Sequence, residues 1–157
     1  MKKIYSVSMD KTTDITSNCL TNSELSSSIQ IRVYYEDTDS GGVVYYANYL
    51  KFIERGRSEY LRNLGFELDQ LSTNQGIIFA VKSLTADYLS PARLNDKLEV
   101  KTCVLKTSRV SIVFLHKIVN PKQNKVLFEA QVVIVCLNIN NFKPSAIPSV
   151  ILEKIYG

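Results

Sequence analysis

The fold is decided by residues 47–64, which read ANYLKFIERGRSEYLRNL. Apolar side chains recur there at helical spacing, which predicts a helix with one apolar face. That face is expected to carry Leu50, Ile53, Tyr60, Leu61 and Leu64. Gly65 stands where a helix C-terminal cap belongs, whereas Gly56 inside the helix costs about 1 kcal/mol relative to Ala. We therefore expect Gly56 to mark a close approach of the helix to a sheet.

Strands are expected on both sides of this helix in the chain. Before it, Ile31, Val33 and Tyr35 alternate with their neighbours, which predicts a strand with one face toward a core. After it and a polar linker, strand patterns occupy residues 76–88, 97–105, 109–119 and 126–137, and a short helix is expected over 148–155. Short connections such as NPKQNK favour antiparallel neighbours. The sequence thus predicts an α+β fold, with a curved antiparallel sheet wrapped around one long helix.

Length and composition indicate one soluble domain, expected over residues 29–157. The chain has 157 residues, of which 45% are hydrophobic and 22% charged, and its net charge is +4. Residues 1–28 are rich in Ser, Thr and Asn without apolar periodicity, which predicts a flexible N-terminal tail. The modest charge and the lack of long basic runs argue against a nucleic-acid partner.

Other sequence features indicate where the protein acts and what it binds. No apolar run reaches the length of a transmembrane helix, and the cysteines show no Cys-x-x-Cys spacing. We therefore expect a cytoplasmic protein without a metal site. The outer face of the sheet carries apolar residues such as Val133 and Val135, and covering that face with a second copy predicts an oligomer.

The candidate site is an acidic turn before the helix, at residues 37–42 (DTDSGG). Backbone N–H groups in the first turn of a helix lack intrahelical partners, and the dipole adds partial positive charge. The helix start near Tyr45 to Asn48 can therefore receive a developing oxyanion, while Asp37 or Asp39 acts as nucleophile or general base. The same aspartates also suit an N-cap or an Asx turn, so a structural role stays open at this point.

The stretch VYYEDTDSGGVVYYANYLKFIERGRSEYL resembles the hotdog-fold acyl-CoA thioesterases. It is most similar to their tol-pal-associated (YbgC-like) branch and also to 4-hydroxybenzoyl-CoA thioesterase. The family pattern is matched by Asp37, Asp39, Gly42, Val43, Val44, Asn48 and Tyr49. The resemblance extends over about residues 29–140, including DYLSPARLNDKLEV. It implies a hotdog fold and a homodimer or homotetramer with active sites between subunits.

The resemblance also implies the roles of individual residues. It assigns the catalytic carboxylate to Asp39 and implies that the backbone N–H of Tyr46 polarises the thioester carbonyl. Substrate contacts are expected from Gly42, Val43, Tyr45, Asn48, Tyr49 and Arg109, although core packing stays open for the tyrosines and ordinary solvation for Arg109. Branch members usually carry His where this chain has Tyr46, a change that keeps the backbone donor but loses any role of an imidazole.

The implied reaction is hydrolysis of a small acyl thioester, short-chain or aromatic, to a free acid and a thiol. The acyl group can be carried by CoA or by acyl carrier protein, and no cofactor is implied. A peripheral membrane association is left open.

Two other classes of function stay open. One is a non-catalytic acyl-CoA or acyl-carrier-protein binding or scaffold protein of envelope or lipid metabolism. The other is a dehydratase of 3-hydroxyacyl thioesters, which needs a catalytic His beside a carboxylate. His116, the single histidine, shares a predicted strand face with Ile112 and Phe114, so we expect it to be structural.

Overall fold

The computed structural model describes residues 26–157. In chain order its elements are β1 (Ser27–Arg32), the 3-10 turn η3 (Tyr35–Asp37), α1 (Asn48–Asn63), α2 (Leu68–Gln75), β2 (Ile77–Tyr88), β3 (Lys97–Thr107), β4 (Ser111–Asn120), the 3-10 turn η4 (Pro121–Gln123), β5 (Lys125–Asn138) and α3 (Ser149–Tyr156). The flexible tail expected over residues 1–28 stays a prediction, because residues 1–25 lie outside the described part. β1 begins at Ser27, slightly before the expected domain start.

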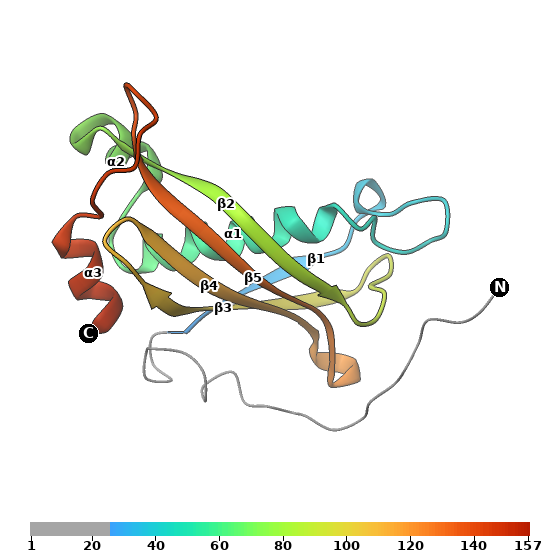
Figure 1. Ribbon diagram of the computed structural model, residues 1–157. Helices are drawn as coiled ribbons and strands as arrows, with labels where there is room; N and C mark the ends of the chain where they lie inside the picture. Colours follow the sequence, from blue (N-terminus) through green and yellow to red (C-terminus); the bar gives the residue numbers. More distant parts are fainter. Residues whose placement is uncertain (1–25) are drawn as a thin grey trace.

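The five strands form one antiparallel sheet in the order β1-β3-β4-β5-β2. The sheet curves around α1, with α2 and α3 gathered at one end (Figure 1). Register shifts between Val81 and Ser83 and between Val104 and Lys106 add local bends to the long strands. The predicted α+β architecture, a curved antiparallel sheet around one long helix, is confirmed.

The core lies between α1 and the concave face of the sheet. α1 buries Phe52, Ile53, Tyr60 and Leu61 there. The expected close approach at Gly56 is confirmed, because a Cβ added to it would lie 2.6 Å from Thr102 Oγ1 and 3.0 Å from Val100 Cγ1.

The expected C-terminal cap of α1 is also confirmed. Gly65 has a φ of +93°, a left-handed conformation that glycine adopts readily. Its N–H donates to the carbonyl of Arg62 at 2.9 Å, and the N–H of Phe66 donates to the carbonyl of Leu61 at 3.0 Å. This is the Schellman pattern, which satisfies the last carbonyls of the helix.

Two expectations about buried faces are wrong. Tyr35 does not extend the first strand: it begins η3 and retains 81% of its accessible surface. The chain turns there because the N–H of Tyr34 donates to Asp37 Oδ2 at 2.8 Å. Leu50 retains 37% of its surface, whereas Tyr49, one position earlier, retains 3% and stacks on Phe128.

The segment expected to be a polar linker contains a helix, α2. Its sequence, LDQLSTNQ, has too few apolar residues to show a helical period. Leu71 is buried against the core, and Gly76 ends the helix with a φ of +64°. Tertiary contact and a glycine cap therefore specify α2 where local periodicity does not. In the described part of the chain, no helix has the length and apolarity needed to span a membrane.

Candidate active site

The acidic turn folds into a compact loop between η3 and α1. The N–H of Asp39 donates to the carbonyl of Val43 at 2.9 Å, and the N–H of Gly42 donates to the carbonyl of Asp39 at 3.0 Å. Gly42 has a φ of +72°, so a side chain at this position would be strained. The N–H of Val44 donates to the carbonyl of Ala92 at 2.9 Å. The loop is therefore closed on itself and fixed to the connection between β2 and β3.

The two aspartates of the loop have different surroundings. Asp37 Oδ2 accepts the N–H of Tyr34, and the carbonyl of Asp37 accepts the N–H of Tyr45 at 2.8 Å and Asn48 Nδ2 at 2.9 Å. Asp37 thus holds the loop against the start of α1. Asp39 is exposed, and its Oδ1 accepts the N–H of Gly41 at 2.8 Å. Because Asp39 presents its carboxylate at the surface, it is the better candidate for a nucleophile or general base.

The start of α1 presents free backbone donors. Within residues 26–157, no acceptor takes the backbone N–H of Tyr46 or of Ala47. Tyr46 as a whole residue retains 62% of its accessible surface. Free N–H groups at a helix N-terminus, reinforced by the dipole, are suited to bind a developing oxyanion. The loop therefore carries a carboxylate and a candidate oxyanion site a few residues apart.

Aromatic rings extend from this loop into the core. The Tyr45 and Tyr46 rings lie 4.8 Å apart at their centroids, and hydrogen bonding to Tyr46 together with the nearby Tyr46 charge raises the pKa of Tyr45. Tyr49 is buried, its hydroxyl accepts the N–H of Ala92 at 3.0 Å, and burial raises its pKa. Of the three tyrosines expected near an acyl group, Tyr45 and Tyr46 are at the surface and Tyr49 belongs to the core.

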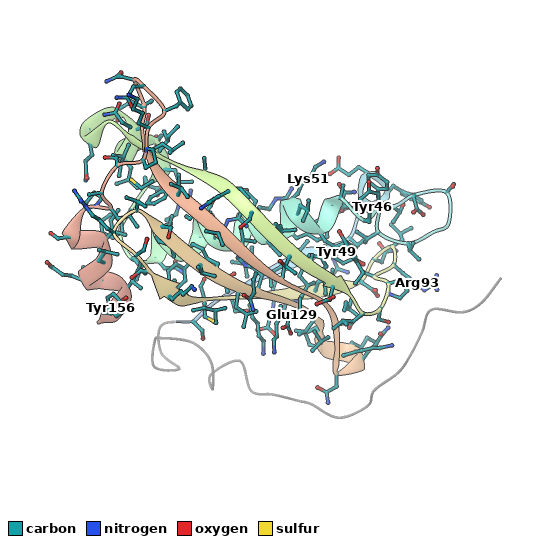
Figure 2. All side chains as sticks on the ribbon, viewed as in Figure 1. Tyr46, Tyr49, Lys51, Arg93, Glu129 and Tyr156 are labelled. Atoms are coloured by element: carbon teal, nitrogen blue, oxygen red, sulfur yellow. The ribbon has the colours of Figure 1, made fainter. Side chains whose placement is uncertain are left out.

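The remaining predicted residues fall in different places. Gly42 and Val43 lie in the loop, and Asn48 is 6% exposed and bonds to Asp37 as described. Arg109 lies in the β3–β4 turn, where its carbonyl accepts the N–H of Ile147 just before α3. Figure 2 shows Tyr156 of α3 at the opposite end of the molecule from Tyr46. A single chain therefore does not bring Arg109 to the acidic loop.

His116 is a core histidine. It has no accessible surface, and its pKa is lowered to about 3 by burial and by the charge of Arg57. Its Nδ1 lies 3.0 Å from Thr102 Oγ1, and its Nε2 lies 3.5 Å from Arg57 Nη1. Because arginine only donates, Nε2 is the acceptor and Nδ1–H donates to Thr102. These partners tie α1 to β3 and β4. Neither partner is a carboxylate, which disfavours the dehydratase function.

Two residues beside the loop were missed by sequence reasoning. The Tyr88 hydroxyl donates to the carbonyl of Tyr46 at 3.0 Å, and Arg93 forms a β-bridge with Val43. Figure 2 shows Arg93 at the same end of the molecule as Tyr46. Both residues belong to DYLSPARLNDKLEV, which carries part of the family resemblance. That resemblance was the available signal, because no local period distinguishes them.

The hollow beside the acidic loop is open to solvent rather than enclosed. A surface hollow of about 420 Å³ flanks the loop between the end of β1, η3 and Arg55, but neither Asp39 nor Tyr46 lines it. Within residues 26–157, no cluster of three His, Cys, Asp or Glu side chains is arranged to bind a metal ion.

The fold and the loop define a class of protein. The family model of the thioesterase-like superfamily matches residues 33–155, and this chain belongs to that superfamily. The acyl-CoA thioester hydrolase YbgC of Escherichia coli O6:H1 is 44% identical over 124 residues, covering 79% of this chain and 91% of the relative. The acyl-CoA thioesterase YbgC of Haemophilus influenzae is 43% identical over 121 residues, covering 77% and 88%.

Solved structures show the same fold. A probable thioesterase from Bartonella henselae superimposes with a TM-score of 0.73 at 34% identity, covering 78% of this chain and 99% of that one. The match confirms the hotdog architecture that the resemblance implied.

Proposed function

We propose that this protein is an acyl-CoA thioesterase in which Asp39 and the start of α1 carry out the reaction. The observation that carries the proposal is that one short loop presents an exposed carboxylate and two free backbone amides, in a chain of the thioesterase-like superfamily. Relatives at 44% and 43% identity are acyl-CoA thioester hydrolases. Membership of the superfamily and the geometry of the loop therefore both support thioester hydrolysis.

The chemistry needs few groups. A thioester carbonyl is electrophilic, and an alkyl thiol with a pKa near ~8.5 leaves with little help from a general acid. In one route the Asp39 carboxylate attacks the carbonyl carbon, thiolate leaves, and water hydrolyses the resulting anhydride. In the other route Asp39 takes a proton from the attacking water. In both routes the negative charge on the carbonyl oxygen develops against the N–H of Tyr46.

A thiol-release assay on Asp39→Asn tests this proposal. The substitution keeps the size of the side chain and its acceptor for the N–H of Gly41, but it removes the charge. We expect kcat to fall at least about 100-fold, the usual contribution of a positioned acid or base. Asp69→Asn is the matched control, because Asp69 is another exposed aspartate whose Oδ1 accepts a nearby backbone N–H, here that of Gln70 at 2.9 Å. Undiminished turnover in Asp39→Asn would remove the proposed mechanism.

The substrate and setting are part of the proposal. We propose short-chain or aromatic acyl groups, carried on CoA or on acyl carrier protein, and action in the cytoplasm, where such thioesters are made. Resemblance to the tol-pal-associated branch supports a role near the envelope. A panel of acyl-CoAs of increasing length, with the matching acyl carrier proteins, measures the preference directly. Binding of acyl-CoA without thiol release would instead favour the non-catalytic scaffold function.

We also propose that the active unit is a homodimer or a homotetramer. β2 is an edge strand on which Val81, Leu84 and Tyr88 retain 54%, 40% and 48% of their surface, and exposed apolar edges favour pairing with another chain. The half-buried Val133 and Val135 give the outer sheet face a second apolar surface. Association with a second copy would also cover the exposed surface around Asp39.

Light scattering on purified variants tests the assembly. Leu84→Lys is expected to weaken pairing along β2, whereas Val133→Lys is expected to turn tetramers into dimers and leave that pairing intact. A wild-type protein that is fully active as a monomer would contradict the proposed assembly.

A further inference from the structure

Tyr88, the last residue of β2, is hydrogen-bonded to the candidate oxyanion site. Its hydroxyl donates to the carbonyl of Tyr46 at 3.0 Å. The end of β2 lies beside the start of α1, as Figure 1 shows. The Tyr46 carbonyl and the Ala47 N–H belong to one peptide group, so the Tyr88 hydroxyl acts on the group that offers one of the two free amides.

Packing fixes the position of this hydroxyl. The Tyr88 ring meets Phe128 at a centroid distance of 5.0 Å and Tyr49 at 5.5 Å, both nearly edge-on. Its backbone pairs with Phe128 across the β2–β5 ladder. Although Tyr88 is half-exposed, its ring also lies near the Tyr46 ring, at a centroid distance of 6.4 Å. The hydroxyl is therefore preorganised, and little further ordering is needed for it to act on Tyr46.

The carbonyl of Tyr46 takes its hydrogen bond from a side chain outside the helix, unlike the carbonyls on either side of it. At the start of α1 the N–H of Asn48 donates to the carbonyl of Tyr45 at 2.9 Å, and the N–H of Leu50 donates to the carbonyl of Ala47 at 3.1 Å. The Tyr46 carbonyl lies between these two acceptors and receives the Tyr88 hydroxyl. A hydrogen bond to a peptide oxygen polarises that peptide and strengthens its N–H as a donor.

We propose that Tyr88 is a positioning residue for thioester hydrolysis, which fixes and polarises the Tyr46–Ala47 peptide so that Ala47 N–H joins Tyr46 N–H as an oxyanion donor. This inference rests on the proposed function. In this role Tyr88 acts through the Tyr46 carbonyl, and no bond to it forms or breaks. Its effect is largest in the transition state, because negative charge on the carbonyl oxygen is greatest there.

Kinetics of Tyr88→Phe provide the first test. Phenylalanine keeps the ring contacts with Tyr49 and Phe128 and loses only the donor. We expect kcat to fall by about two- to tenfold, the effect of one modest hydrogen bond, with KM changed less than about twofold. Tyr156→Phe is the matched control, since it removes a tyrosine hydroxyl that bonds Thr107 at the far end of the molecule. Replacing Tyr88 by p-aminophenylalanine, which restores a donor, should recover kcat.

A substrate-free measurement provides the second test. In protein labelled with ¹⁵N-alanine, loss of the Tyr88 donor should move the Ala47 amide proton upfield, because its peptide becomes less polarised. Amides of distant alanines such as Ala146 should not move. An unchanged kcat, a change confined to KM, or an Ala47 amide that does not move would each overturn the inference. Wild-type protein that releases no thiol would instead refute the proposed function, and the Ala47 measurement is independent of that result.

Discussion

Gly56→Ala should destabilise the protein, although alanine is the better helix former. The added Cβ would lie 2.6 Å from Thr102 Oγ1, closer than real Cβ contacts come. Thr102 cannot withdraw easily, because it is fully buried and its Oγ1 is bonded to His116 Nδ1 at 3.0 Å. Overpacking of this kind costs about 1–3 kcal/mol, and the gain in helix propensity offsets about 1 kcal/mol. We expect a net loss of up to about 2 kcal/mol.

Urea unfolding followed by circular dichroism measures this loss as a shift in midpoint at constant m-value. The melting temperature should fall by up to about 8 °C for a domain of this size. A double-mutant cycle with Thr102→Ala isolates the contact, because Gly56→Ala should cost less once Thr102 Oγ1 is absent. If Gly56→Ala stabilises the protein, or costs the same in both backgrounds, α1 does not approach β3 as described.

Three further predictions concern Gly41, Tyr60 and His116. Gly41→Ala places a Cβ 3.1 Å from Asp39 Oδ1, so kcat in the thiol-release assay should fall about tenfold with unfolding free energy unchanged; wild-type kcat would contradict this. Tyr60→Phe removes a buried hydroxyl that has no partner among residues 26–157 and whose pKa burial raises to about 12; urea unfolding should show a gain of about 1 kcal/mol, and a loss would reveal a partner. His116 binds a proton more weakly in the folded state, with a pKa of about 3, than in the unfolded chain; its contribution is therefore present above pH ~6.5 and lost as pH falls, by about 2 kcal/mol at pH 5. Unfolding at pH 7 and pH 5 should show this loss in wild type but not in His116→Gln, and equal losses would contradict it.

Elements with a strong local period were predictable from the sequence. α1, the four later strands and α3 occur where hydrophobic spacing placed them, and Gly56 and Gly65 play the expected parts. A glycine inside an amphipathic helix is informative because its helix penalty needs a compensating contact. The antiparallel pairing of β3 with β4 and of β4 with β5 also follows from the short connections between them, whereas β1 pairs with β3 and β2 with β5 across long stretches of chain.

Features that depend on tertiary contacts or on single local hydrogen bonds and caps were not predictable. α2 exists because Leu71 is buried and Gly76 caps the helix, and neither fact appears as a period in its sequence. Tyr35 continued the alternation of the first strand, but the bond from the N–H of Tyr34 to Asp37 ends the extended chain before it. A side chain that bonds the backbone locally competes with strand geometry, and periodicity does not record this competition.

The candidate site separates into parts that hold the backbone and parts that face solvent. Asp37, Asn48 and the main chain of Val44 fix the loop to the helix start and to the β2–β3 connection, whereas Asp39 and the amides of Tyr46 and Ala47 stay available. The resemblance placed Tyr46 where branch members usually carry His. Because the proposed donor is a main-chain N–H, exchanging the side chain at this position would keep the proposed oxyanion site. A phenol instead of an imidazole changes the exposed surface beside the proposed site, so we expect the substitution to affect substrate choice more than the capacity for hydrolysis.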